Sequence, residues 1–226
     1  AAPPANAEAG QTAAPPPPPA EETKIGVSRG LAAWLTKNQT SFAISSYQSG
    51  RLFLVGTMPD GTVSVHQQAF SRAMGICWDR NGLWLASRVQ IWRLENILPE
   101  GMTARGRFDR SLMPRKTYIT GDIDVHELAV DGSGNPVFVN TSFSCLAMLD
   151  PVESFRPIWK PPFISELARE DRCHMNGIGM VDGKPKYVTA VSQTDVADGW
   201  HGRPLPKGVI IDVQTDRVVT GQLSMP

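Results

Sequence analysis

The sequence of 226 residues has few cysteines, no long apolar run and no excess of charge of either sign. Cys77, Cys145 and Cys173 are an odd, widely spaced set, which excludes a disulfide framework and the CxxC spacing of zinc and redox motifs. Thiols of this kind fit a reducing compartment, so we expect a cytoplasmic protein. No run approaches the length of a membrane span, and no secretory signal is visible at the N-terminus.

The charges balance, since Lys and Arg together number 22 and so do Asp and Glu, which gives a formal net charge of zero. There is no basic run and no stripe of aromatic and arginine residues, so the sequence argues against a nucleic-acid groove. The chain also begins with Ala1 instead of Met, and we therefore expect a processed or excised piece.

Apolar residues are scarce in residues 1–24, which are rich in Ala, Pro and Glu and contain the proline run Pro15–Pro19. Such a run adopts an extended polyproline II form, and the segment cannot bury enough apolar surface to fold. We predict a disordered tether here. As an alternative, the proline run could be a ligand for an SH3-like partner.

What is present is a repeat. Residues 74–87, 126–141 and 175–189 lie about fifty residues apart and share one pattern. Each has a short apolar strand, a tight turn of Asp, Asn and Gly, and a second strand of aromatic and β-branched residues. Hairpins repeated at this period predict an all-β fold, a β-propeller-like array of four-stranded blades.

Four blades fit into residues 40–226, and Asn81-Gly82 in the second is the strongest hairpin signal. Residues 25–39 predict a short helix with Ser28 as its N-cap. Between the third and fourth blades, residues 151–162 have an irregular pattern and residues 164–169 predict a second short helix. Propellers close on themselves to avoid unpaired faces and edges, and rings of four blades are uncommon. We therefore expect an incomplete ring that a second chain or a further segment completes.

The first strand of each blade lines the central channel of a propeller. The repeat aligns His126 with His174 at the start of such strands, and Glu127 and Asn176 lie beside them. We predict these four residues as ligands of a divalent ion, because imidazole suits zinc whereas carboxylate and amide oxygens suit calcium. The alternative is that they make ordinary hydrogen bonds at the ends of strands.

Six further residues are predicted to bind a ligand or a partner: Arg72, Asp124, Arg172, Trp200, His201 and Arg203. The last three belong to a long polar loop, residues 192–203, whose composition favours recognition of a protein partner. Two structural alternatives remain open. Arg172 could pair with Asp171, and the loop could pack on a neighbouring blade.

Several motifs resemble those of one uncharacterised bacterial family. They are EDRCHMNG at 170–177, WKPPFIS at 159–165, NTSFSCLA at 140–147 and YVTA at 187–190. The resemblance covers residues 42–226 and implies a conserved domain of unknown function, sometimes attached to tetratricopeptide repeats. Members of the family continue beyond LSMP at 223–226 with further propeller-like repeats, which agrees with an incomplete ring. The resemblance implies no catalytic residues.

Two function classes follow from the sequence. The first is a binding or assembly module that presents loops to a protein partner and is tethered by the proline-rich segment. The second is a metal-dependent propeller enzyme of lactonase or hydrolase type, with its site at the mouth of the channel. No constellation in the sequence requires catalysis, so the first is favoured.

Overall fold

The fold is a propeller-like array of antiparallel sheets, seen here in a computed structural model that describes residues 25–202 and 207–226. The predicted tether, residues 1–24, and Arg203 lie outside the described residues. One short helix, α1 (Leu31–Asn38), precedes the sheets. No helix in the described ranges is long and apolar enough to cross a membrane.

The strands form four sheets, which we call blades 1 to 4. Blade 1 contains β1 (Phe42–Ser46), β2 (Arg51–Thr57) and β3 (Val63–Ala69). Blade 2 contains β4 (Ile76–Asp79), β5 (Gly82–Ala86), β6 (Gln90–Asn96) and β7 (Leu112–Ile119). Blade 3 contains β8 (Val125–Val130), β9 (Pro136–Asn140), β10 (Cys145–Met148) and β11 (Arg156–Trp159). Blade 4 contains β12 (Met175–Val181), β13 (Lys184–Ala190), β14 (Gly208–Asp212) and β15 (Arg217–Leu223).

The all-β propeller fold predicted from the hairpin repeat is confirmed, with one difference. Blades 2, 3 and 4 have four strands, whereas blade 1 has three among the described residues. Within every blade the strands follow one another in chain order, so each blade is a meander of hairpins. Asp79 pairs with Gly82, so the hairpin predicted at Asn81-Gly82 forms with its two-residue turn one position earlier, at Arg80-Asn81. Other connections are long loops, such as residues 97–111 between β6 and β7.

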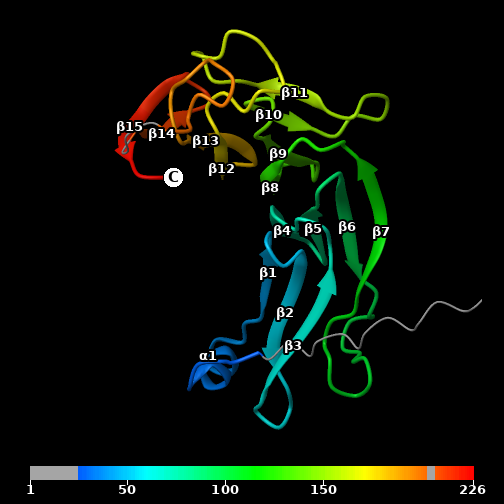
Figure 1. Cartoon of the computed structure of the whole chain (residues 1–226). Coiled ribbons are helices and arrows are strands. Elements are labelled where there is room, and N and C mark those ends of the chain that lie inside the picture. Colours follow the sequence, from blue (N-terminus) through cyan, green and yellow to red (C-terminus); the bar gives the residue numbers. More distant parts are fainter. Residues whose placement is uncertain (1–24, 203–206) are drawn as a thin grey trace, which may run out of the picture.

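The four blades lie along an open arc, with blade 1 at one end and blade 4 at the other (Figure 1). Their first strands face the inside of the arc and contact one another in order, β1 with β4, β4 with β8 and β8 with β12. These strands therefore correspond to the channel-lining strands predicted from the repeat. The arc does not close on itself within the described residues, because its two ends lie apart in Figure 1.

Apolar side chains fill each seam between neighbouring blades. Leu52 of blade 1 packs with Leu85 of blade 2, and Trp84 of blade 2 packs with Phe138 of blade 3. At the third seam, Val139 of blade 3 packs in one cluster with Val188 and other side chains of blade 4. A strand alternates its side chains between two faces, so each inner blade contributes one face to the seam before it and one to the seam after it.

The helices differ from their prediction in two ways. Helix α1 has Gly30 as its N-cap, with φ of 85° and no capping side chain, so Ser28 is not the cap. No helix forms at residues 164–169. That segment instead lies around the guanidinium of Arg172, which binds Ser165, Glu166 and Glu170. These polar contacts hold the segment in an irregular form.

Candidate functional site

Arg72, Asp124 and His174 occupy the same place in blades 2, 3 and 4. Each stands four residues before the first-strand member of a matching ladder pair, Ile76↔Leu85, Leu128↔Phe138 and Ile178↔Val188. Their φ values are 51°, 54° and 50°, a left-handed conformation that is costly for residues with a side chain. The repetition of this strained position in three blades places three polar side chains at one end of the inner strands.

The prediction that His126 and His174 are equivalent is therefore wrong by two residues. By the same ladder pairs, His174 corresponds to Asp124, and His126 corresponds to Asn176. The two imidazoles still meet across the seam between blades 3 and 4, with ring centroids 4.8 Å apart and planes at 83°.

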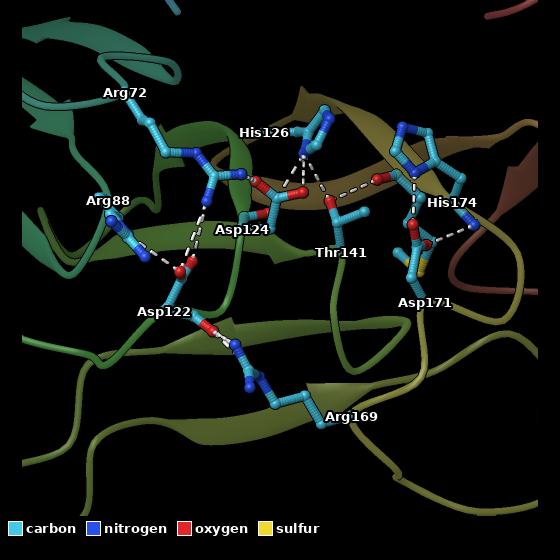
Figure 2. A network of polar contacts seen from close by, with 10 residues as sticks. Arg72, Arg88, Asp122, Asp124, His126, Thr141, Arg169, Asp171 and His174 are labelled. Carbon is cyan, nitrogen blue, oxygen red and sulfur yellow. Dashed lines mark hydrogen bonds and ion pairs between the residues drawn. The ribbon is translucent and has the colours of Figure 1, made fainter. Parts of the chain in front are cut away.

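An ionic network joins blades 2 and 3 (Figure 2). Arg72 places one guanidinium nitrogen 3.1 Å from a carboxylate oxygen of Asp124 and another 3.3 Å from Asp122. Arg88 reaches the same Asp122 carboxylate at 3.1 Å. The guanidinium of Arg72 also lies over the ring of Tyr47, 5.0 Å from its centroid, which links blade 1 to the network. Arg72 and Asp124, both predicted as binding residues, are thus already paired with each other.

His126 is held by a hydroxyl that bridges two blades. The Thr141 hydroxyl lies 2.9 Å from His126 Nδ1 and donates to the Met175 carbonyl at 2.7 Å. The second neighbour of Nδ1 is the Asp124 carbonyl, at 3.2 Å, which can only accept. Since the one hydroxyl proton of Thr141 goes to Met175, Nδ1 of His126 carries the ring proton and Nε2 carries a lone pair. Burial lowers the pKa of His126 below its usual value, and the nearby Asp124 carboxylate opposes this only in part.

His174 is held by Asp171. The carboxylate accepts from the His174 backbone N–H at 3.0 Å and contacts its Nδ1 at 2.7 Å. A carboxylate can only accept, so Nδ1 of His174 also carries a ring proton, and in the neutral imidazole the lone pair lies on Nε2. Trp200 donates its indole N–H to the same Asp171 carboxylate at 2.9 Å.

The predicted recognition loop folds back onto this site. The Trp200 ring lies against His174, with centroids 4.0 Å apart, and against His201, with centroids 3.7 Å apart. Trp200 is therefore half-buried and engaged, while His201 remains exposed. Trp200 thus packs on the segment before β12 of its own blade, whereas the alternative was packing on a neighbouring blade. The role of His201 in recognition stays a prediction.

A pocket of about 320 Å³ opens beside His126 on the inner side of the arc. Ser45 of blade 1, Ile76 of blade 2 and Glu127 of blade 3 contribute to its lining, so three blades meet there. One carboxylate oxygen of Glu127 accepts from the Ile178 N–H at 3.3 Å. The pocket gives solvent or a small ligand access to His126.

The four predicted metal ligands do not form one cluster. Glu127 faces the Ile178 backbone, and Asn176 donates its amide to the Pro226 carbonyl at 3.0 Å. In residues 25–202 and 207–226 there is no group of three or more His, Cys, Asp or Glu side chains that could hold a metal ion. His126 and His174 are the members that the structure brings together.

Arg172 has a structural environment of its own. Its guanidinium binds three carboxylates, those of Glu166 and Glu170 at 2.9 Å and that of Asp195 at 2.8 Å. These partners raise the pKa of Arg172 above its usual value, the Asp195 contact most of all. Arg172 therefore ties the segment before β12 to the loop after β13, and the alternative that it pairs with Asp171 is wrong.

Cys145 and Cys173 are fully buried free thiols. Burial raises the pKa of each to about 12, so neither is a ready nucleophile or metal ligand at neutral pH. Thr141 and Asp122 were not among the residues predicted from the sequence, although both hold the network together. A threonine directly after an apolar strand carries no distinctive signal, which explains the omission.

Comparisons with known proteins found two solved structures with low similarity and one family. Among solved structures, the crystal structure of Citrobacter koseri AztD matches with 13% identity and a TM-score of 0.32, over 81% of this chain and 46% of that one. The structure of apo AztD from Citrobacter koseri matches with 13% identity and a TM-score of 0.33, over 81% and 47%. The chain thus spans about half the length of these structures. No curated protein matches the sequence.

The sequence model of one family, described as a domain of unknown function, matches residues 29–226. This agrees with the uncharacterised family that the motifs indicated, whereas the bacterial origin and the tetratricopeptide repeats stay predictions. The chain belongs to this family, DUF4915.

Proposed function

We infer that the chain is an assembly module, in which the outward face of blade 4 binds a further antiparallel β-blade and so continues the propeller. The observation that carries this proposal is one cross-strand pair that recurs in blades 2, 3 and 4. The pair is Ala86↔Ile91 in blade 2, Val139↔Leu146 in blade 3 and Thr189↔Ile210 in blade 4.

The first two pairs are buried in seams. Ala86 and Ile91 pack in the cluster that blade 3 completes, and Val139 and Leu146 pack in the cluster that blade 4 completes. In blade 4 the corresponding Thr189 and Ile210 are only partly buried. The same sheet face is thus covered in two blades and uncovered in the third.

Tyr187 shows the same contrast. Its counterparts in the ladder, Trp84 and Val137, are 7% and 1% exposed, whereas Tyr187 is 39% exposed. Tyr187 packs beside Gly179 of β12, with its Cβ 3.5 Å from where a Cβ of residue 179 would lie. An apolar face of this kind is stabilised when another sheet covers it.

The other end of the arc explains why the proposed occupant is not a second copy of this chain. The outward face of blade 1 carries α1, which contacts β2 and buries Leu35 there. Trp34 of α1 stacks on Phe42 with ring centroids 5.8 Å apart. Blade 1 of a second copy would have to lose this helix before it could pack on blade 4. The occupant we propose is a blade with an apolar rear face like that of blade 3, where Phe138 and Cys145 are buried.

The partner contact therefore involves the sheet face of blade 4, whereas the sequence analysis assigned it to the loop 192–203. A photo-cross-linking experiment tests this in the complete gene product, expressed in its own cells. A benzoylphenylalanine at Tyr187 is expected to cross-link to a peptide with the alternating pattern of a strand, and the same probe at exposed Val152 is the control. Ile210→Asp should abolish the cross-link, whereas Val152→Asp should leave it intact.

The proposal fails if position 187 cross-links no better than position 152, or if its cross-links persist in Ile210→Asp. The intact mass of the cross-linked species shows whether the further blade belongs to the same polypeptide or to a second chain. Either result supports the assembly role and identifies the source of the blade.

A further inference from the structure

We propose that His126 and His174 form an open two-histidine site for a divalent transition-metal ion of the zinc class, at the seam between blades 3 and 4. This site is independent of whether a further blade binds to blade 4. It also differs from the four-residue set expected from the sequence, because Glu127 and Asn176 are not part of it.

The first support is the orientation of the two rings. In both histidines the nitrogen that is hydrogen-bonded is Nδ1, to Thr141 in one case and to Asp171 in the other. Those partners require a proton on Nδ1, so each neutral ring presents the lone pair of Nε2. In Figure 2 the Nε2 atoms of both rings lie on the same side of the network. The rings belong to adjacent blades and lie 4.8 Å apart, centroid to centroid.

The second support is the environment behind the rings. Metal-binding histidines usually donate their other ring N–H to a carboxylate, a carbonyl or a hydroxyl, which fixes the ring and raises its basicity. Asp171 accepts this hydrogen bond from Nδ1 of His174 at the short distance of 2.7 Å. Thr141 and the Asp124 carbonyl play it for His126. Both side chains are largely buried, with 19% and 15% exposure, so the rings are held in place before any ion arrives.

The third support is access. His126 lines the pocket of about 320 Å³, so water or a small ligand can reach this ring from the inner side of the arc. A site with two imidazoles and open positions resembles an exchangeable or reactive centre more than a closed structural one. Imidazole nitrogens bind zinc, copper or nickel, whereas calcium requires oxygen ligands. Of the two ions predicted from the sequence, zinc therefore fits this site and calcium does not.

The test is titration of the purified, chelator-treated protein with Zn²⁺, followed by calorimetry. One ion per chain is expected, and a large excess of Ca²⁺ should not compete. His126→Asn and His174→Asn are the informative variants, because the amide of Asn can replace the Nδ1 donor while the Nε2 ligand is lost. Each should weaken Zn²⁺ binding at least about tenfold. His66→Ala, at an exposed histidine of β3, is the matched control and should bind Zn²⁺ as the parent does.

Asp171 is a positioning residue, and Asp171→Asn should also weaken binding by about tenfold without removing a ligand. Nitrogen-15 NMR of the metal-free protein provides a separate readout, since it reports which ring nitrogen of each histidine carries the proton. The proposal is overturned if Zn²⁺ fails to bind, if both Asn variants bind it as the parent does, if Ca²⁺ displaces it, or if the lone pairs lie on Nδ1.

Discussion

Arg72 and Asp124 hold equivalent positions in neighbouring blades, and their side chains meet across the seam at 3.1 Å. Both residues have left-handed backbone conformations, with φ of 51° and 54°. The chain thus repeats a strained backbone position in order to direct polar side chains to the inner end of each blade. His174, with φ of 50°, continues the series in blade 4.

The backbone strain at Arg72 can be separated from its ion pairs. Arg72→Ala and Arg72→Gly both remove the contacts with Asp122 and Asp124, but only glycine adopts a positive φ without cost. We expect Arg72→Gly to be more stable than Arg72→Ala by about 1 kcal/mol in urea unfolding. Equal stability of the two variants would contradict the left-handed conformation at this position.

A second prediction concerns the closest approach between inner strands. A Cβ at Gly75 would lie 2.9 Å from backbone atoms of Glu127 on β8, and backbone cannot move aside easily. Gly75→Ala should therefore force β4 from β8 and destabilise the protein by about 1–3 kcal/mol in the same assay. Gly26→Ala is the control, because that position has no atom within 4 Å and no positive φ. If Gly75→Ala and Gly26→Ala were equally stable, the result would contradict the close approach of residue 75 to β8.

The strands were predictable where the side-chain pattern and the turns agree. Each of the hairpin repeats at residues 74–87, 126–141 and 175–189 contains a pair of adjacent strands, because turns rich in Asp, Asn and Gly separate the apolar segments there. β11 was missed because this edge strand is mostly exposed and contains Pro157, so its sequence lacks the apolar alternation of a strand.

The site was predictable only as a set of residue types. The repeat placed His126 and His174 at the starts of inner strands, and the structure brings Arg72 and Asp124 to the same end. Their partners depend on how the blades stack, as in the contact of Thr141 with Met175, 34 residues away. The two-residue error in aligning His126 with His174 has the same origin, because hydrogen bonds between strands decide the register and the sequence does not display them.

Acid should lower the stability of the folded protein in part by protonating the Asp195 carboxylate. Hydrogen bonds from Ser165 and Arg172 hold the pKa of this carboxyl below its usual value of 3.8. The folded state then binds its proton less readily than the unfolded state, so the stabilisation is present above pH 3.8 and is lost as the pH falls through the lower folded pKa. Melting temperatures measured from about pH 5 to pH 2 should fall less steeply in Asp195→Asn than in the parent. Parallel profiles would contradict this role of Asp195.

The last prediction concerns the hydroxyl that connects blades 3 and 4. Thr141 is fully buried, and its hydroxyl donates to the Met175 carbonyl of blade 4 while it accepts from His126 of blade 3. Thr141→Val has a similar shape but leaves a buried carbonyl and a buried ring N–H without this partner, which should cost about 1–3 kcal/mol in urea unfolding. Thr141→Ser keeps the hydroxyl and should lose less stability than Thr141→Val. If Val proved as stable as Thr, the bridge would contribute nothing to the seam, and the tautomer assigned to His126 would lose its support.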